Sequence, residues 1–497
     1  MSPTPHNACV FLFHRDLRVV DNTAFNAAVH WSRSQDGGVL VPLFVLPPEQ
    51  IDVGANKYFS NAAVQFMCES LKDLDTAITK LSHGTTGLVM LRADTLDALD
   101  AIRKHPNITL SDVFCNMDYS VYAKARDKTI ANWCKTHDIS FSGDMEDYDI
   151  VPLSQGLVQG LYPYTNLSQY FAKFTKGDLQ VHEPATAVRL DRKHFIKLSP
   201  SSSRKLVTIE DLSGLYVSSP DIVQHGGRTN GLKILSKIKK RTYDAYGEER
   251  DYPAVVDGTT KVSAHLHFGT ISIREMFHSA GNNSPLVREL VFRSFYIKIY
   301  SHKPELQRGT AFRKELDDHL KMAYVSTNAA SWKAWTEGRT GFPLVDAGMR
   351  QLAKEGWVHN RVRMLVAVTV TRYLLHDWRD CARFFYTKLV DADTFSNTAG
   401  WQWSAGIGPD AVPYFRAPMN PYIQSKKFDA DAIYIKKWIP ELADVLPKDI
   451  HKWDEEKTRK KYPNCKYPAP IIGQKEASAR AVATMKAAHT HTLSRSA

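Results

Sequence analysis

Charged and aromatic side chains gather in residues 356–403, a stretch that is otherwise largely apolar. Its charged side chains include Arg361, Arg363, Asp391 and Asp393. Three large rings stand close to them in the sequence: Trp378, Trp401 and Trp403. A charge removed from water must be paired or used in binding, because leaving it bare is costly. The combination therefore suits a flat, polar-edged aromatic cofactor with an anionic tail.

A second motif is rich in hydroxyl groups and precedes a predicted helix. It reads Asp-Gly-Thr-Thr-Lys-Val-Ser over residues 257–263. Ser and Thr cap helices, and the amide groups at a helix start can bind phosphate oxygens. Taken alone, the loop favours ordinary capping over a phosphate site.

Residues 286–296 place an acid and a base on one helix face. Glu289 and Arg293 are four residues apart, which makes them neighbours on the surface of an α-helix. Such a pair is commonly a surface ion pair that contributes roughly a few tenths of a kcal/mol. The spacing alone therefore does not decide between a surface pair and a functional acid.

Three strings in this half of the chain occur together: Trp-x-His-Asn-Arg-x-Arg-Met from Trp357, Asp-x-Asp from Asp391 and Gly-Trp-Gln-Trp from Gly400. In this order and spacing they resemble the photolyase/cryptochrome family of flavoproteins, most closely the class I type that repairs cyclobutane pyrimidine dimers (CPDs). One string alone would also fit a Trp-rich helical core with internal salt bridges, because a motif counts only in its context. The resemblance covers nearly the whole chain and implies FAD as cofactor and ultraviolet-damaged DNA as partner.

The resemblance assigns a set of positions to FAD. The hydroxyl-rich loop matches the family's flavin-diphosphate loop, Asp391 and Asp393 match acids at the polar edge of the flavin, and Asn397 matches the residue that faces flavin N5. Arg363 is expected to pair with Asp391. The positions assigned to FAD binding are Tyr246, Thr259, Thr260, Lys261, Val262, Ser263, Leu286, Arg293, Trp357, Arg363, Asp391, Ala392, Asp393 and Asn397.

A second set of positions is expected to face DNA. Glu289 matches the acid that hydrogen-bonds a damaged base as its carbonyl becomes negative. The catalytic residues that the resemblance implies are Glu289, Asn360, Met364 and Asn397. The expected DNA contacts are Arg250, Glu289, Phe292, Asn360, Arg361, Met364, Trp403 and Gln424. Phe292 and Leu286 stand where the family usually has Trp, and the smaller Phe292 ring offers less stacking area.

Trp401 and Trp378 match the inner two members of the family's electron-transfer chain. The third member should lie near residue 325, and Val325 cannot be oxidised. The adjacent Tyr324 is the nearest oxidisable ring, so either Tyr324 substitutes or the chain ends elsewhere. Core packing is the competing interpretation, because most tryptophans serve only that purpose.

The composition indicates a globular protein of two or three domains, with 497 residues, 43% of them hydrophobic and 24% charged. The net charge of +11 favours an anionic partner, nucleic acid first, although charge alone is weak evidence. Six scattered cysteines without CxxC spacing indicate neither a metal site nor a disulfide framework. No signal peptide and no apolar run of about eighteen residues is seen. We therefore expect a monomer in the nucleus or cytoplasm, neither secreted nor in a membrane.

Apolar runs and helical patterns alternate in the first part of the chain. The runs at residues 8–13, 39–46, 88–91 and 113–115 are typical of strands buried on both faces, and residues 62–81 and 95–102 have helical spacing. This alternation predicts an α/β fold with a doubly wound parallel sheet. Beyond residue 231 helical spacing dominates, as at residues 287–300, 332–335, 343–354 and 358–375, and predicts an all-α part.

With the resemblance, this division predicts four segments. They are an α/β antenna domain at residues 1–142, a linker at 143–225, a helical FAD-binding catalytic domain at 226–488 and a short tail at 489–497. Many cryptochromes carry long signalling tails, so the short tail favours a photolyase.

A polar string follows the first predicted strand, at the carboxyl end where doubly wound sheets bind ligands. It reads His-Arg-Asp-Leu-Arg-Val-Val-Asp-Asn over residues 14–22 and resembles the start of the photolyase antenna domain, as do residues 116–119 and 126–127. There is no GxGxxG or P-loop, so a standard dinucleotide or ATP site is not supported. In the family this domain can hold a folate (methenyltetrahydrofolate) or a deazaflavin, and an empty antenna is a third alternative.

The resemblance implies light-dependent repair of CPDs by an electron from reduced FAD. Asn360 and Met364 stand where enzymes that repair (6-4) photoproducts have two histidines, which favours the CPD substrate. The alternative is a cryptochrome-type blue-light photoreceptor, and a flavin-free DNA-binding protein is a third interpretation. A repair assay separates the first two, and the colour of the purified protein tests the third.

Overall fold

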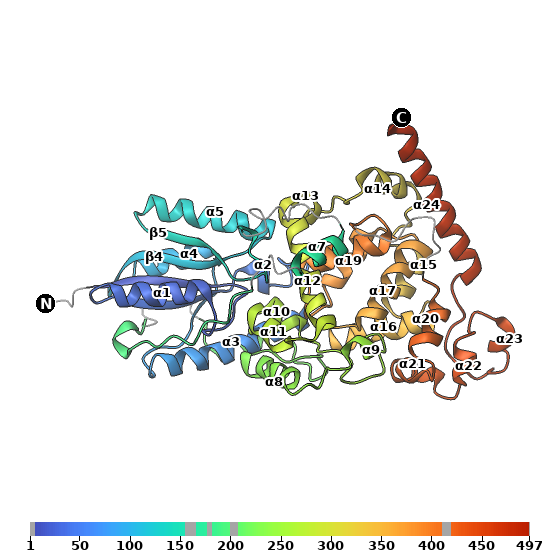
Figure 1. The fold of residues 1–497 in the computed structure, drawn as a ribbon, viewed down its shortest axis with the longest axis horizontal. Helices are drawn as coiled ribbons and strands as arrows, with labels where there is room; N and C mark the ends of the chain where they lie inside the picture. Colours follow the sequence, from blue (N-terminus) through green and yellow to red (C-terminus); the bar gives the residue numbers. More distant parts are fainter. Residues whose placement is uncertain (1–4, 155–165, 176–180, 199–206, 410–418, 497) are drawn as a thin grey trace.

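The structure is a computed structural model that describes residues 5–154, 166–175, 181–198, 207–409 and 419–496. Figure 1 shows an α/β part at the N-terminal end and a helical part beside it, with the two termini at opposite ends of the molecule. No helix among the described residues has the length and apolar character needed to cross a membrane.

The α/β part is built on one five-stranded sheet. Its strands are β1 (His6–Phe13), β2 (Val39–Val45), β3 (Val89–Leu91), β4 (Ile108–Met117) and β5 (Ser140–Glu146). Their order is β3-β2-β1-β4-β5, and every neighbouring pair is parallel. In the register of the central strands, Val10 pairs with Val41 on one side and Val113 on the other. The predicted doubly wound parallel sheet is thus confirmed.

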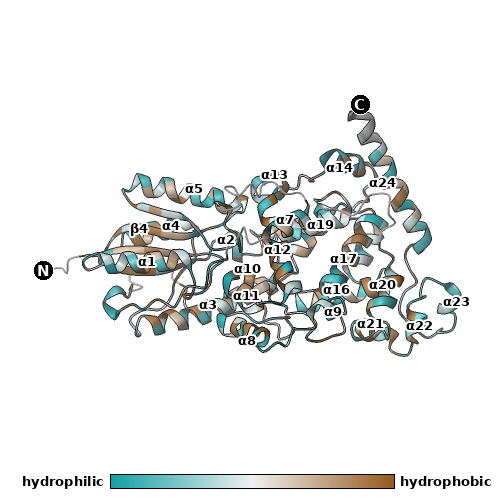
Figure 2. Ribbon diagram, in the orientation of Figure 1, coloured by the Kyte–Doolittle hydropathy of each residue, from teal (hydrophilic) through white to brown (hydrophobic). Residues whose placement is uncertain are grey.

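Helices cover both faces of this sheet, which explains why its strands are apolar on both sides. Cys9, Phe11 and Phe13 of β1 pack with α1 (Thr23–Ser34) and α3 (Asn61–Leu81). The alternate β1 residues face α4 (Thr95–Arg103) and α5 (Val121–Thr136). Figure 2 shows hydrophobic residues along the strands, whereas the outer helix α5 is largely hydrophilic.

The predicted strands and helices of this part are all present. Strand β5 was not predicted, because its residues are mostly half-buried or exposed at the sheet edge and form no apolar run. Residue 142, the predicted domain boundary, lies inside β5. A short helix, α2 (Pro48–Ile51), follows β2.

The predicted linker is held against the helical part. Its helix α7 (Leu167–Thr175) packs on α12 (Ser284–His302), where the Tyr170 hydroxyl lies 2.9 Å from Ser294 Oγ. Two 3-10 turns, Arg192–His194 and Asp211–Leu215, follow along the linker.

The remaining chain is helical, as predicted: no strand longer than a single bridge follows β5 in the described ranges. The helices are α8 (Arg228–Lys239), α9 (Tyr246–Glu249), α10 (Ser263–His267), α11 (Ile273–Ala280), α12, α13 (Pro304–Gln307), α14 (Lys314–Leu320), α15 (Ala330–Thr336), α16 (Pro343–Glu355), α17 (Asn360–Val368), α18 (Trp378–Tyr386), α19 (Thr394–Ala405), α20 (Pro421–Phe428), α21 (Ile433–Trp438), α22 (Pro447–Ile450), α23 (Glu456–Arg459) and α24 (Gln474–Ser496). A π-helical turn, Thr369–Tyr373, extends α17.

The backbones of the two parts meet directly beside α10. The amide of Leu17 donates to the carbonyl of Phe268 at 3.1 Å. Gly269 has a φ of +62°, and a Cβ there would lie 2.1 Å from the Arg15 carbonyl oxygen. Only glycine allows both this conformation and this approach. The contact therefore fixes the position of the loop after β1 against the helical part.

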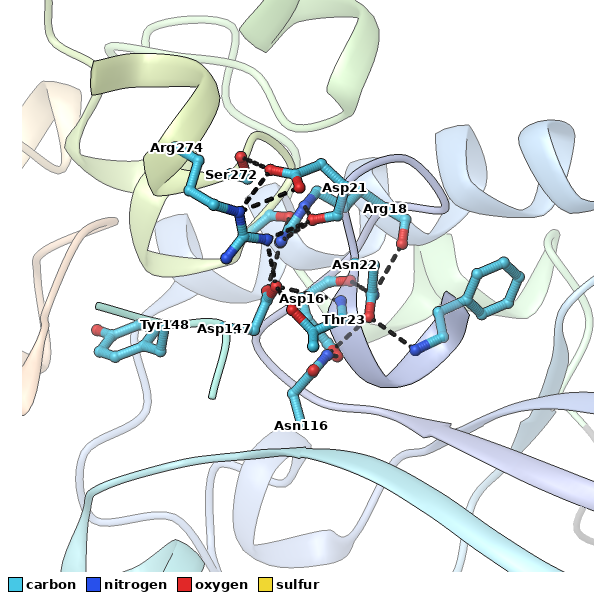
Figure 3. Close-up of polar contacts among 12 residues, drawn as sticks. Asp16, Arg18, Asp21, Asn22, Thr23, Asn116, Asp147, Tyr148, Ser272 and Arg274 are labelled. Carbon is cyan, nitrogen blue, oxygen red and sulfur yellow. Dashed lines mark hydrogen bonds and ion pairs between the residues drawn. The ribbon is translucent and has the colours of Figure 1, made fainter. Parts of the chain in front are cut away.

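Buried ion pairs reinforce the same junction (Figure 3). Arg18 binds Asp147, and Arg274 of α11 reaches Asp147 at 2.7 Å and Asp21 at 3.0 Å. Burial alone would raise the pKa of Asp147, but the charges of Arg18 and Arg274 lower it to about 2. The carboxylate is therefore ionised and paired at neutral pH.

Candidate functional site

A cavity of about 470 Å³ opens among α12, α17 and α19. Ligand pockets of this size, lined by apolar groups with a few convergent polar ones, are typical of small-molecule sites. The predicted site residues that line it are Arg250, Glu289, Phe292, Arg293, Asn360, Arg361, Arg363, Met364, Asn397, Trp401 and Trp403. Positions expected to contact FAD and positions expected to contact DNA thus share one cavity.

Helix α12 supplies an acid to the wall of this cavity. Glu289 forms an ion pair with Arg250, and the Arg250 guanidinium lies 5.8 Å from the centre of the Tyr246 ring. Both partners are about one-third exposed or less, at 33% for Glu289 and 26% for Arg250. The acid is therefore accessible from the cavity and paired with a cation.

Helix α17 begins at the cavity, with His359 as its N-cap. His359 Nδ1 accepts from the Arg361 amide at 3.2 Å, so the ring proton belongs on Nε2. Burial lowers the pKa of His359 to about 4, and the ring is neutral near neutral pH. His359 does not line the cavity, whereas the following Asn360 and, one turn further, Met364 do.

Arg361, an expected DNA contact, makes a two-pronged ion pair with Asp251 at 2.6 and 3.2 Å. Its guanidinium also lies 4.7 Å from the centre of the Phe428 ring. Asp251 lines the cavity and was not singled out in the sequence, because its partner lies 110 residues away.

Helix α19 carries a hydrogen-bonded amide into the site. Asn397 Oδ1 accepts from Arg363 Nη2 at 2.8 Å and from Trp401 Nε1 at 3.2 Å. The Asn397 side chain is buried and oriented by these two donors. The structure therefore fixes Asn397, Arg363 and Trp401 as one unit.

Asp391 joins the hydroxyl-rich loop to the cavity region. Ser263 donates to Asp391 Oδ2 at 2.6 Å, which brings the predicted loop and the predicted acid together. Arg363, its expected partner, lies 4.0 Å away, at the limit of an ion pair, because its closer contact is Asn397. Asp391 Oδ1 is buried without a hydrogen-bond partner among the described residues.

Asp393 caps α19 by accepting from the Ser396 amide at 2.9 Å, and it reaches the α/β part. It contacts the Tyr148 hydroxyl, Arg15 at 3.4 Å and His267 at 3.9 Å. Burial opposes ionisation, but the contact with His267 and the charges of Arg15 and Arg293 hold the pKa of Asp393 well below its ordinary value. Arg15 and Tyr148 were not predicted here, because their sequence positions lie far from Asp393.

These residues fit a flavin. The buried, unpartnered Asp391 Oδ1 is an acceptor aimed at a donor such as a ring N–H or a ribose hydroxyl, which FAD provides. Thr260 and Ser263 lie in the loop joined to that acid, with Lys261 beside them. Lys261 has a left-handed backbone (φ +51°) and lies 5.8 Å from the centre of the Trp357 ring. Strained backbone of this kind is concentrated at ligand sites.

Known proteins resemble this chain in sequence. The sequence matches the family DNA photolyase over residues 9–188 and the FAD binding domain of DNA photolyase over residues 286–487. The deoxyribodipyrimidine photo-lyase of Agrobacterium fabrum is 32% identical, over 96% of this chain and 97% of that protein. This chain belongs to the DNA photolyase family.

Solved photolyases also have this fold. An archaeal photolyase from Sulfolobus tokodaii, with two FAD molecules, is 33% identical with a TM-score of 0.80, over 97% of this chain and 100% of that one. A Synechocystis cryptochrome is 20% identical and shares the fold, with a TM-score of 0.79 over 98% of this chain and 100% of that one. Family, fold class and FAD as cofactor are confirmed as predicted.

Several residues that the resemblance assigned to FAD or DNA do not line the cavity. Leu286 is buried in the core around α12, and Trp357 is buried against the α/β part. Gln424 lies on α20, one turn before the Phe428 ring that contacts Arg361, and does not itself line the cavity.

The expected electron-transfer rings make two separate sets of contacts. Trp401 packs edge-on against Phe385 and Trp335, with ring centres 4.9 and 6.3 Å apart. Trp378 Nε1 and the Tyr324 hydroxyl both donate to Asp317, which was not predicted. Asp317 lies 61 residues before Trp378 and carries no motif of its own.

A second cavity, of about 600 Å³, lies between the two parts of the photolyase. Its walls include Arg15 after β1, Asp118 after β4, and Tyr386, Thr394 and Thr398 of the helical part. Strand order reverses between β1 and β4, and such a switch point is where doubly wound sheets bind ligands. The polar string after β1 therefore stands where its position in the sequence predicted.

Proposed function

We propose that the protein is a deoxyribodipyrimidine photo-lyase, which splits CPDs in ultraviolet-damaged DNA. The observation that carries the proposal is the shared cavity, which has Arg363, Asn397 and Trp401 on its wall together with Glu289 and Met364. A cofactor held by the first group and a base flipped toward the second would be close enough for electron transfer. Bound FAD, reduced and excited by light, supplies the electron that starts ring splitting.

On the cofactor side, this chain's residues bind and orient. Asp391 offers an unused acceptor, and Ser263 ties the diphosphate loop to it. Asn397 is held by Arg363 and Trp401, so its amide can face the flavin without further ordering. A neutral amide rather than an acid at this place is compatible with a negatively charged reduced flavin.

On the DNA side, Glu289 is the group that meets developing charge. A protonated carboxyl there can donate to a pyrimidine carbonyl as electron density builds on it. Arg250, its partner in the free protein, would be released to a phosphate when a base enters. Trp403 offers a stacking face to a base taken out of the duplex, and Met364 offers polarizable apolar surface.

The cavity wall favours the CPD over the (6-4) photoproduct. Repair of the latter needs a proton as well as an electron, and histidine is the usual donor near neutral pH. Asn360 cannot give up a proton, and Met364 has none to give. The adjacent His359 is neutral, caps α17 and does not line the cavity.

Light-dependent repair of defined CPD and (6-4) duplexes tests the proposal. We expect CPD splitting that requires light and bound FAD, with (6-4) DNA left intact. Efficient (6-4) repair with CPD DNA untouched would overturn the substrate assignment. Light-induced signalling changes without repair of either lesion would support a cryptochrome instead.

We also propose that the cavity between the two parts holds a light-harvesting pigment. Its position at the strand-order switch point and its volume support a flat aromatic ligand. Folate, deazaflavin and an empty site remain the alternatives, and the absorption spectrum of the extracted cofactors distinguishes them.

The domain limits at residues 225 and 488 are further proposals, as are a monomeric state and a place in the nucleus or cytoplasm, and we move the first limit from residue 142 to the end of β5 at Glu146. The net charge of +11 supports association with nucleic acid. Sedimentation of the purified protein would test the oligomeric state, and localisation of a tagged copy in cells would test the compartment.

A further inference from the structure

Asp317 is a buried carboxylate in the middle of α14 with no part in the chemistry described so far. Only 1% of its surface is exposed. Its Oδ1 accepts from the Tyr324 hydroxyl at 3.0 Å and from Trp378 Nε1 at 3.2 Å. Its Oδ2 faces cations, the guanidinium of Arg379 and Lys321 Nζ at 3.7 Å. One oxygen is thus engaged by cations, and the other joins two oxidisable rings.

Charges of both signs lie near the Trp378 ring, because the Asp317 carboxylate accepts from its Nε1 at 3.2 Å and Arg379 stands over its face. The Arg379 guanidinium lies 4.7 Å from the ring centre, where it repels a radical cation. An electron supplied by Tyr324 would remove that repulsion. Tyr324 is half-buried at the end of a short 3-10 turn, Lys321–Ala323, and is therefore closer to solvent than the buried Trp378.

A tyrosine that supplies an electron also needs a nearby group to accept its proton. Burial, together with the charges of Asp317 and Asp377, raises the pKa of Tyr324 far above its usual range, so the side chain is a neutral phenol. Loss of an electron makes a phenol strongly acidic, and efficient oxidation requires a base within hydrogen-bond reach. Asp317 Oδ1 is that base by position, and Arg379 holds the carboxylate in place from the other side.

We propose that Asp317 accepts the Tyr324 proton and so makes Tyr324 the terminus of the electron-transfer chain. The proposal rests on the FAD-dependent function proposed above. With bound oxidised FAD as the light-driven electron acceptor, Trp401 would be oxidised first and would in turn oxidise Trp378, which would take one electron from Tyr324. The O–H bond of Tyr324 breaks and its proton moves to Asp317 Oδ1. The products are neutral Trp378, a neutral tyrosyl radical and protonated Asp317. A thiol in solution returns an electron, and the proton moves back.

The test follows radicals in the FAD-loaded protein after a light pulse, by transient absorption and electron paramagnetic resonance. The variants are Asp317→Asn, Tyr324→Phe and, as a matched control, Asp377→Asn. Asp377 is also a carboxylate paired with Arg379, at 3.0 Å, but it makes no hydrogen bond to Tyr324. Asn also preserves the N-cap that Asp377 provides for α18.

In the wild type we expect a tyrosyl radical that Tyr324→Phe removes. Asp317→Asn should slow its formation by about 100-fold, the usual contribution of a positioned base. Asp377→Asn should stay within about fivefold, as for a partly exposed ion pair. Equal rates in Asp317→Asn and the wild type, or a wild type without a tyrosyl radical, would overturn the proposal.

A second measurement needs no variant at Asp317. Infrared difference spectra of the wild type should show the carbonyl band of a newly protonated carboxylic acid, appearing together with the tyrosyl radical. A radical that forms without this band would overturn the proposal. Repair of CPD DNA by wild-type protein carrying chemically reduced FAD is measured separately. A failure there would count against the repair function and leave the radical result unchanged.

Discussion

The guanidinium of Arg15, which follows β1, lies 3.4 Å from the carboxylate of Asp393, which caps α19. The same guanidinium binds Asp118 after β4 at 2.8 and 2.9 Å. Arg15 also lies on the wall of the cavity between the two parts. One side chain thus connects the proposed pigment cavity with an acid of the proposed flavin site.

We expect Arg15→Ala to cost about 3 kcal/mol of folding stability near neutral pH, because it leaves two largely buried carboxylates without their partner. Burial opposes the ionisation of Asp118 and Asp393, but Arg15 helps to hold the pKa of each below its ordinary value. Their stabilising effect is therefore present above about pH 4 and is lost as the pH falls through the lowered values.

Urea unfolding at neutral and acidic pH checks this, since the difference between wild type and Arg15→Ala should shrink in acid. Arg92→Ala is the matched control, because Arg92 pairs with Asp52 at the surface with 51% of its side chain exposed. It should cost less than about 1 kcal/mol. A loss for Arg15→Ala that does not change with pH would contradict the electrostatic explanation.

Asp391→Ala should weaken FAD binding roughly 10- to 100-fold, since a hydrogen bond to a charged group contributes about 1.5–3 kcal/mol. Flavin fluorescence titration of the apoprotein measures the change. Asp380→Asn on α18 is the control, because its exposed ion pair with Arg383 lies on the surface. If Asp391→Ala binds FAD as tightly as the wild type, the unpartnered Oδ1 is not a flavin contact.

Trp401→Phe should slow photoreduction of oxidised FAD by more than an order of magnitude. Phe is far harder to oxidise, and the variant keeps the ring that packs on Phe385 and Trp335. Trp438→Phe, at a buried tryptophan of α21, should change little. Absorption spectra recorded during illumination follow the reduction of FAD. An unchanged rate for Trp401→Phe would direct attention to another first donor.

Glu289→Ala should lower the rate of CPD repair about 100-fold, the usual effect of removing one donor to a developing negative charge. FAD content should remain that of the wild type, because the acid faces the DNA side of the cavity. Glu248→Ala, at an exposed acid on α9, serves as the control. Repair that survives Glu289→Ala undiminished would remove Glu289 from the catalytic residues.

Much of the fold follows from local patterns in the sequence. Strands β1 and β2 are buried on both faces, so their apolar runs identify them without knowledge of partners. Strand β5 lies at the sheet edge, where hydrogen bonding to β4 rather than apolar packing decides its conformation. An edge strand of that kind leaves little signal in its own residues.

Site residues could be predicted where they belong to a sequence motif. Residues that meet only because the folded chain brings distant segments together could not. The strings around Trp357 and Asp391 led to residues that the structure places around Asn397, Arg363 and Ser263. Asp251, Asp317 and Tyr148 have no motif, and their respective partners Arg361, Trp378 and Asp393 lie 110, 61 and 245 residues away. The preference of Arg363 for Asn397 over Asp391 depends on distances of 2.8 and 4.0 Å, which spacing cannot resolve.

The close approach at Gly269 has an optical consequence. Because the backbone on each side of the junction is in direct contact, the spacing between the two cavities is set by main chain and not by side-chain rotamers. Transfer of excitation between two pigments depends steeply on their separation and mutual orientation. For the flavin and the proposed second pigment, we therefore expect substitutions within either cavity to shift the colour that the pigment absorbs while the transfer geometry stays constant.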